Sequence, residues 1–195
     1  MAALGAILAR NGALRAIGFD DAPFQRGRKG DVGVAGVVCS GTRFEGMVWG
    51  RIRQDGWNAT DRLLRLLCGG KFLPQLHLVL LDGLNLGGFN VVDLPRLAAE
   101  TGVPCVAVMR RRPDLEAIDR ALQRLPRVAE RRRLLARGGP LYGSPPRVFQ
   151  VSGAGPVEVE AALARLTDRG HVPEALRLAH LIGSAVVRGE SSRRA

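Results

Sequence analysis

Two patterns of apolar and polar positions alternate along the central part of this chain. An apolar run at 76–81 ends at Asp82-Gly83, which is typical of a strand buried on both faces and closed by a turn. Residues 93–100 then carry apolar residues at helical spacing, and Gly102 is placed to end the helix. A second apolar run follows at 103–109. Strand, helix and strand in this order predict two parallel strands joined by a right-handed crossover.

The segments on either side extend this pattern. Residues 31–40 and 43–53 read as strands, and the two-residue turn between them makes these strands antiparallel. We interpret 1–13 as an N-terminal extension, 14–188 as a single domain and 189–195 as a polar tail. The other predicted elements are strands at 14–19 and 148–151, a helix capped at Asn58 or Thr60 and running to Cys68, helices at 114–125, 128–137, 156–166 and 173–187, and a loop at 138–146.

This order of elements is that of the ribonuclease H-like fold. It predicts an α/β protein with a mixed five-stranded sheet, in the strand order 3-2-1-4-5, flanked by helices. In that fold the first strand lies beside the fourth and parallel to it, so Asp20 and Asp82 would end neighbouring strands on one sheet edge. Neighbouring strands are about 4.8 Å apart. The two carboxylates could therefore share a divalent ion, Mg²⁺ or Mn²⁺, and would repel each other without one.

The charge of the chain indicates an anionic partner. Lysine and arginine together number 29 against 18 acidic residues, a formal net charge of +11, and Lys29 and Lys71 are the only lysines. A GC-rich genome would explain the preference for arginine but not the excess of positive charge. Arg110, Arg111 and Arg112 follow the second central strand, at the edge that carries Asp82. Because arginine binds phosphate with two parallel hydrogen bonds, we expect these three to contact a nucleic-acid backbone.

Other classes of protein are disfavoured. The three cysteines show no metal-ligand spacing, and Cys39 and Cys105 lie within apolar runs, as small core residues do. No stretch is long and apolar enough to span a membrane, and the N-terminus lacks a basic region and a cleavage site. We therefore expect a cytoplasmic protein without a membrane partner.

Several acidic and glycine residues have two interpretations. Asp21 could be a second metal ligand or could cap the turn that follows it, and Asp61 could be a substitute third acid or a carboxylate in the first turn of a helix. Asp93 is expected to cap the helix that follows it. Gly87 and Gly88 could bring backbone N–H groups to a phosphate, or could simply form a turn.

The remaining charged candidates lie on predicted helices. The run 131–133 of three arginines is expected to be a solvated helix face. His180 lies among apolar residues, as a packed and hydrogen-bonded histidine does. Glu174 and Arg177 are three residues apart and are placed to pair with each other.

Four stretches together resemble an uncharacterised family that is catalogued as domain of unknown function 99, and the resemblance covers residues 15–190. That family is in turn similar to endonuclease V, a magnesium-dependent nuclease of ribonuclease H-like fold that acts at deaminated purines. The matching stretches are IGFDDAPF at 17–24, LLDG at 80–83 followed by GGFNVVD at 87–93, MRRRPDL at 109–115, and PEALRLAH at 173–180.

The resemblance implies roles for individual residues. Asp20 matches the metal-binding aspartate of the first strand, Asp82-Gly83 matches the aspartate-glycine pair of the central strand, and Arg177 and Ala179 fall in a similar C-terminal segment. The chain also departs from endonuclease V. It has no glutamate at 58–61, Met109-Arg110 replaces a lysine, and no histidine lies at 153–155.

Two functions follow from these matches and departures. The first is a metal-dependent nuclease, with Asp20 and Asp82 as catalytic metal ligands, that acts on or binds nucleic-acid phosphodiesters. The second is a non-catalytic protein that binds nucleic acid or nucleotides on a degenerate endonuclease V-like scaffold, which the missing groups favour.

Overall fold

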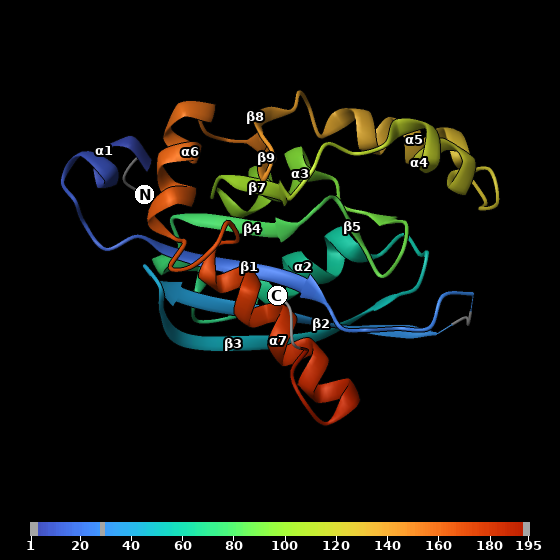
Figure 1. Ribbon diagram of the computed structural model, residues 1–195, viewed down its shortest axis with the longest axis horizontal. Helices are drawn as coiled ribbons and strands as arrows, with labels where there is room; N and C mark the ends of the chain where they lie inside the picture. The colour runs from blue at the N-terminus through green and yellow to red at the C-terminus, as the bar shows by residue number, and fades with distance from the viewer. Residues whose placement is uncertain (1–3, 28–29, 193–195) are drawn as a thin grey trace.

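A seven-stranded mixed sheet forms the centre of the molecule (Figure 1). The computed structural model describes residues 4–27 and 30–192. The sheet strands are β1 (Arg15–Asp21), β2 (Asp31–Ser40), β3 (Arg43–Arg53), β4 (Leu78–Asp82), β7 (Cys105–Met109), β8 (Tyr142–Ser144) and β9 (Arg147–Ser152). Their order is β3-β2-β1-β4-β7-β9-β8, and β5 (Asn85–Leu86) and β6 (Asn90–Val91) form a separate two-stranded hairpin.

The first five strands confirm the predicted fold. The order 3-2-1-4-5 is that of β3, β2, β1, β4 and β7. Strand β1 pairs antiparallel with β2 and parallel with β4, with Phe19 opposite Leu81. Strand β4 in turn pairs parallel with β7. The register of β1 against β4 places the next residues, Asp20 and Asp82, at the same edge of the sheet.

The predicted number of strands was wrong, because β9 and β8 extend the sheet beyond β7. Strand β9 pairs antiparallel with β7 and includes the predicted strand 148–151. Strand β8 lies within the predicted loop 138–146 and pairs with β9. It has only three residues, and Gly143 at its centre has φ of +73°. So short a strand leaves no alternating pattern in the sequence, and the pairing with β9 creates it.

Helices cover both faces of the sheet. The helices are α1 (Leu4–Ala9), α2 (Ala59–Cys68), α3 (Leu94–Thr101), α4 (Leu115–Leu122), α5 (Val128–Arg137), α6 (Pro156–Arg165) and α7 (Glu174–Arg188), with a 3-10 turn, η1 (Leu73–Gln75), before β4. In β4, Val79 and Leu81 pack with α2 and α3 on one face, whereas Leu78 and Leu80 pack with α6 on the other. This double burial explains the uninterrupted apolar run at 76–81.

The ends of the chain fall partly within the described residues. Helix α1 lies inside the predicted extension 1–13, and Leu4 is buried in the cluster that α6 completes. Helix α7 ends at Arg188, followed by Gly189 with φ of +83°. The predicted extension and tail also include residues 1–3 and 193–195, which lie outside the described part. Within residues 4–27 and 30–192, no helix has the length and apolar character needed to cross a membrane.

The buried cysteines belong to the core, as predicted. Cys39 and Cys105 are fully buried, and burial raises the pKa of their thiols to about 11 and about 12. They are inert packing residues rather than reactive thiols.

Helix α7 approaches β1 more closely than any side chain on the strand would allow. It crosses β1 and β2 diagonally (Figure 1), and it contacts β1 at Gly18. A Cβ at Gly18 would lie 2.6 Å from the backbone carbon of Ala175 and from the nitrogen of Leu176. Since backbone atoms cannot turn aside as a side chain can, only glycine fits. This contact sets the position of α7 over the carboxyl end of β1.

Replacing Gly18 by Ala is therefore expected to destabilise the protein by about 1–3 kcal/mol, the usual cost of overpacking a tight contact. Urea unfolding measures the change. Gly30→Ala is the matched control, because no described atom lies within 4 Å of the Cβ that it would add. Equal stability of the two variants would show that α7 is free to shift away from β1.

Candidate functional site

Two aspartates from neighbouring parallel strands meet where the strands end. Asp20 lies near the end of β1 and is 5% exposed, and Asp82 is the last residue of β4. The structure thus brings together the two residues that the sequence analysis had paired. Asp82 retains access to solvent at the mouth of a cavity, although protein surrounds it on most sides. A buried and an accessible carboxylate side by side form a strongly electronegative centre.

His180 of α7 completes this centre. Its Nδ1 lies 2.9 Å from Oδ2 of Asp20, across 160 residues of sequence. Oδ1 of Asp20 accepts the backbone N–H of Asp21 at 2.8 Å, so both oxygens of Asp20 are hydrogen-bonded. A packed and hydrogen-bonded histidine is what the sequence predicts at this position, and in the structure Asp20 is its partner. Only the approach of α7 at Gly18 brings these two residues together.

The third aspartate of the cluster, Asp21, holds the glycine loop. Oδ2 of Asp21 accepts the backbone N–H of Gly87 in a very short hydrogen bond. The N–H of Phe89 donates to Asp55 at 2.8 Å. Gly87 is buried with φ of +57°, and its N–H therefore serves Asp21 rather than pointing at a phosphate. Gly88, with φ of +89°, lines the larger cavity described below.

Two carboxylates of this cluster, those of Asp82 and Asp21, have raised pKa values. Burial raises the pKa of Asp82 to about 6, and Asp20 raises it further, against the opposing effects of Arg110 and His180. Burial likewise raises the pKa of Asp21 to about 6, with smaller contributions from Asp20 and Asp82 and an opposing hydrogen bond from Gly87. The hydrogen bond to Asp20 raises the pKa of His180. The cluster would thus gain most from a bound cation.

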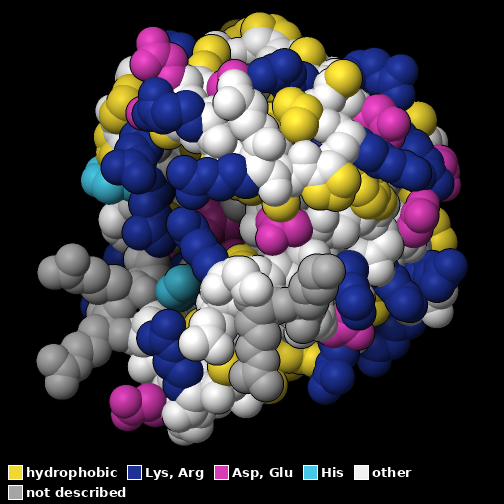
Figure 2. All heavy atoms as spheres, turned by 90° about the vertical axis from the view of Figure 1, so that its right-hand side faces the viewer, with side chains coloured by type: hydrophobic (Ala, Val, Ile, Leu, Met, Phe, Trp, Pro, Cys, Tyr) yellow, Lys and Arg dark blue, Asp and Glu magenta, His cyan; other side chains and the backbone are white. Residues whose placement is uncertain are grey.

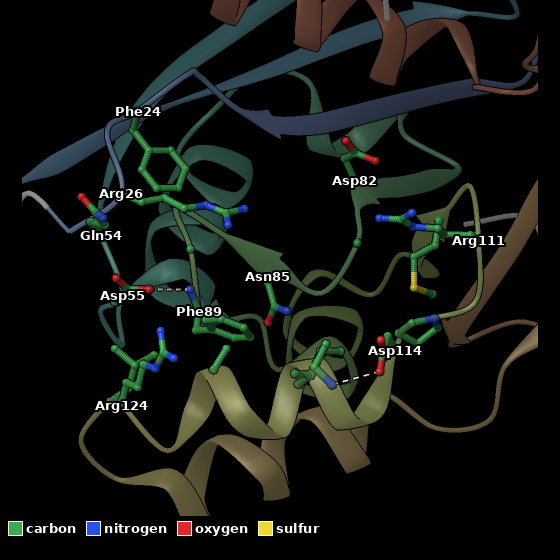
Figure 3. A pocket seen from close by; sticks show the side chains of 18 of the residues that line it. Phe24, Arg26, Gln54, Asp55, Asp82, Asn85, Phe89, Arg111, Asp114 and Arg124 are labelled. Carbon is green, nitrogen blue, oxygen red and sulfur yellow. Dashed lines mark hydrogen bonds between the residues drawn. The ribbon is translucent and has the colours of Figure 1, made fainter.

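A basic cavity of about 1420 Å³ opens beside Asp82. All three arginines of the predicted phosphate site, Arg110, Arg111 and Arg112, line it. Figure 3 shows Arg26 and Arg124 on the opposite wall, with Phe24 and Phe89 near them. Figure 2 shows this side of the molecule from outside, where Lys and Arg side chains gather along one side of a recess. Arg26, Arg124 and the two aromatic residues are not predicted from the sequence, because they lie in turns and loops with no regular spacing.

A smaller cavity of about 730 Å³ lies next to the larger one. Asp82, Gly83 and Asn85 line both cavities, and so does Ile118 of α4. The walls of the smaller cavity are otherwise largely apolar and come from α4, α5 and the end of β7. The two cavities therefore meet at the residues that directly follow β4.

The expectation of a solvated face at residues 131–133 was wrong for Arg131, which is fully buried. Its guanidinium stacks on the ring of Trp57 at 4.3 Å. It donates to the backbone oxygens of Asp55 at 2.6 Å, Gly56 at 3.3 Å and Pro126 at 3.2 Å, and in a very short bond to Phe89. The run of three arginines hid this role, because only one of three neighbouring helix positions faces inward.

The other predicted residues lie away from the centre or serve the fold. Asp61 is on the solvent side of α2, where it pairs with Arg96 at 2.8 Å, and it lines neither cavity. Asp93 accepts the N–H of Arg96 and caps α3, as predicted. Glu174 and Arg177 form the expected ion pair, with two hydrogen bonds of 2.8 and 2.6 Å.

The aspartate pair fits a magnesium or manganese ion better than an ion that needs many protein ligands. Among residues 4–27 and 30–192, no group of three His, Cys, Asp or Glu side chains is arranged to hold a metal. Mg²⁺ is usually held by one or two carboxylates, with waters and substrate phosphates as its other ligands. Asp20 and Asp82 would supply the two carboxylates, and such an ion would favour the charged form of Asp82, whose pKa burial raises.

Comparison with known proteins connects this site to a family. The family model described as endonuclease dU matches residues 12–187. A UPF0215 protein of Deinococcus radiodurans is 46% identical over 178 residues, which cover 91% of each chain. A UPF0215 protein of Methanopyrus kandleri is 37% identical over 187 residues, which cover 92% of this chain and 94% of the relative.

Solved structures share the fold. A protein of unknown function from Archaeoglobus fulgidus superposes with a TM-score of 0.85 and 35% identity, covering 90% of this chain and 99% of its own. The catalytic domain of human endonuclease V gives a TM-score of 0.62 at 18% identity, covering 97% and 88%. Endonuclease V of Ciona intestinalis, solved in complex with DNA containing an inosine, gives 0.54 at 15% identity, covering 87% and 84%. The endonuclease V fold predicted from the sequence motifs is thus confirmed.

Proposed function

This chain belongs to the endonuclease dU family, and from that premise we propose that it is a divalent-metal-dependent endonuclease that acts on nucleic-acid phosphodiesters. The observation that carries the proposal is the pair formed by Asp20 and Asp82 at the edge of a cavity lined with arginines. We propose in addition that this family is the one catalogued as domain of unknown function 99, and that the protein is located in the cytoplasm.

The residues around the pair would have distinct tasks. Asp20 and Asp82 would hold Mg²⁺ or Mn²⁺, which when bound activates water and neutralises charge on the phosphodiester. His180 fixes the orientation of the Asp20 carboxylate through the 2.9 Å hydrogen bond. Asp21 holds the glycine loop against the site through Gly87. None of these tasks requires the glutamate, lysine or histidine by which the chain departs from endonuclease V.

The arginines of the larger cavity would hold the nucleic-acid backbone. Guanidinium groups bind phosphate through two parallel hydrogen bonds and set the register of the strand. The name of the family refers to dU, and the Ciona endonuclease V structure contains DNA with an inosine. Both names support DNA with a deaminated base as the substrate class.

The alternative function is a non-catalytic protein that binds nucleic acid on the same scaffold. The specific observation in its favour is the position of Asp61, which pairs with Arg96 away from the cluster. Among the described residues, the cluster therefore holds three aspartates and no glutamate or further acid. Calorimetric titration with Mg²⁺ and Mn²⁺, followed by incubation with an end-labelled duplex containing one dU, separates the two. The nuclease proposal expects metal binding and a single metal-dependent nick. If neither Mg²⁺ nor Mn²⁺ binds at millimolar concentration, the nuclease proposal fails and the non-catalytic nucleic-acid-binding function remains.

Replacing Arg110, Arg111 and Arg112 together by Ala is expected to weaken oligonucleotide binding and flatten its dependence on salt. Each lost phosphate contact should reduce the slope of log K against log [salt] by about 0.7–0.9. Fluorescence anisotropy at four NaCl concentrations measures the slope. Arg188→Ala, at the end of α7 and outside both cavities, is the control. An unchanged slope in the triple variant would show that the backbone runs elsewhere.

A further inference from the structure

Asp55 fastens the glycine loop to the connection between β3 and α2. Its backbone N–H donates to the carbonyl of Gly87 at 2.8 Å, and its Oδ1 accepts the N–H of Phe89 at 2.8 Å, the contact drawn as a dashed line in Figure 3. The backbone oxygens of Asp55 and Phe89 both accept hydrogen bonds from Arg131. Asp55 therefore holds the loop at two points, and the buried guanidinium fixes both partners in place.

The backbone conformation of Asp55 favours glycine, and the side chain explains why an aspartate stands there. Its φ is +49°, in the left-handed region, which glycine adopts freely and other residues adopt only at a cost in free energy. Aspartate tolerates this region better than most residues, and here its carboxylate has a specific partner in the N–H of Phe89. A Cβ on Gly88 would collide with Oδ1 of Asp55, so the loop has glycine where the carboxylate needs room.

The glycine loop in turn holds the third aspartate of the electronegative centre. The N–H of Gly87 donates to Oδ2 of Asp21 in a very short hydrogen bond. The charges of Asp20 and Asp82 raise the pKa of Asp21, which shows that its carboxylate lies close to theirs. A loop that shifts away from β1 would therefore release the carboxylate of Asp21 beside the aspartate pair.

We propose that Asp55 is a positioning residue for the metal centre, because it holds the glycine loop that keeps the carboxylate of Asp21 in place next to the aspartate pair. This inference rests on the proposed nuclease function, since it requires that the pair binds Mg²⁺ or Mn²⁺. Replacing a residue that orients metal ligands without touching the ion typically changes metal affinity or activity by about 10–100-fold. Replacing Asp55 should thus weaken metal binding although every ligand is still present.

The test compares the Mn²⁺ affinity of variants by isothermal titration calorimetry. Asp55→Gly suits the left-handed backbone but removes the side-chain acceptor, and it is expected to raise the Kd for Mn²⁺ by about 10–100-fold. Asp55→Asn keeps an acceptor oxygen and is expected to recover most of the affinity. The matched control is Asn11→Gly, because Asn11 also has φ of +49° and lies outside both cavities. It should bind Mn²⁺ as the parent does.

The size of the change separates positioning from a role in folding alone. Reversible unfolding weakens apparent binding only in proportion to the folded fraction, so a variant that is half folded loses about twofold. Circular dichroism measures that fraction. A Kd in Asp55→Gly that is unchanged, or changed only as far as unfolding explains, would overturn the positioning role and leave the nuclease proposal intact. A parent that binds no Mn²⁺ would overturn the metal centre itself.

Gly88→Ala replaces Asp55→Gly if the latter fails to fold. The added Cβ would collide with Oδ1 of Asp55 and break the same contact from the side of the loop. Its Kd for Mn²⁺ is expected to rise in the same range. Affinity equal to that of the parent in this variant would likewise overturn the positioning role of Asp55.

Discussion

Replacing Asp82 by Asn is expected to abolish both metal-dependent cleavage and the metal-dependent rise in melting temperature, without loss of metal-free stability. The variant keeps the shape of the side chain but loses one of two carboxylates at the centre. An ion that binds only the folded parent stabilises it by about 2.7 kcal/mol at a hundredfold excess over Kd. Differential scanning fluorimetry with and without 10 mM Mg²⁺, together with the nicking assay, measures both effects.

The difference in stability between the metal-free parent and Asp82→Asn depends on pH with a definite sign. The pKa of Asp82 is about 6 in the folded protein and about 3.9 in an unfolded chain. Its charge therefore destabilises the folded state above pH 6, and this penalty disappears as the pH falls towards 4. Asp82→Asn should exceed the parent in stability by about 0.5–1 kcal/mol at pH 8, after allowance for solvent screening, and match it at pH 4.

Two further variants test the alternative that Asp82 only caps the loop after β4. In that case Asp82→Ala should lose about 0.5–2 kcal/mol, and metal should change neither protein. Asp61→Asn is the matched control, because Asp61 is an exposed carboxylate outside both cavities. It should keep the metal response of the parent. Loss of that response in Asp61→Asn would make Asp61 part of the metal site.

Replacing Arg131 by Met is expected to cost about 3–5 kcal/mol, a large part of the stability of a domain of this size. Arg131 is fully buried and donates to four backbone oxygens on three separate segments. Burial lowers the pKa of its guanidinium, although it remains charged, with Asp55 as the main opposing influence. Removing it leaves the carbonyls of Asp55 and Phe89 buried and unpaired.

Urea unfolding of Arg131→Met, with Arg133→Met as the control, measures this cost. Arg133 is on the same helix and is exposed, so its substitution should change the free energy of unfolding by no more than about 0.5 kcal/mol. Because Asp55 also holds Phe89, Arg131→Met should loosen the wall of the larger cavity as well. Equal stability of the two variants would show that water replaces the guanidinium without cost.

The sequence by itself determined the order of the first five strands of the sheet and the pairing of Asp20 with Asp82. The apolar run at 76–81 is continuous because helices cover both faces of β4, and such a run has few alternative structures. Parallel pairing of β1 with β4 then fixes which residues share an edge. The arginines 110–112 follow from the same logic, since they directly continue β7. The periodicity of a strand is a local property, and the order of strands follows from the order of elements along the chain. Both can therefore be predicted from the sequence.

The tertiary structure alone decided which side chains complete the site. His180 meets Asp20 because α7 closes onto Gly18, a contact between segments about 160 residues apart that no local pattern encodes. Arg131 differs from its neighbours Arg132 and Arg133 only in the direction in which α5 turns it. Asp61 pairs with Arg96 because α2 packs on α3 and points that residue to solvent. A contact between distant segments depends on the packing of whole elements, and the same residue types therefore serve the site in one place and the surface in another.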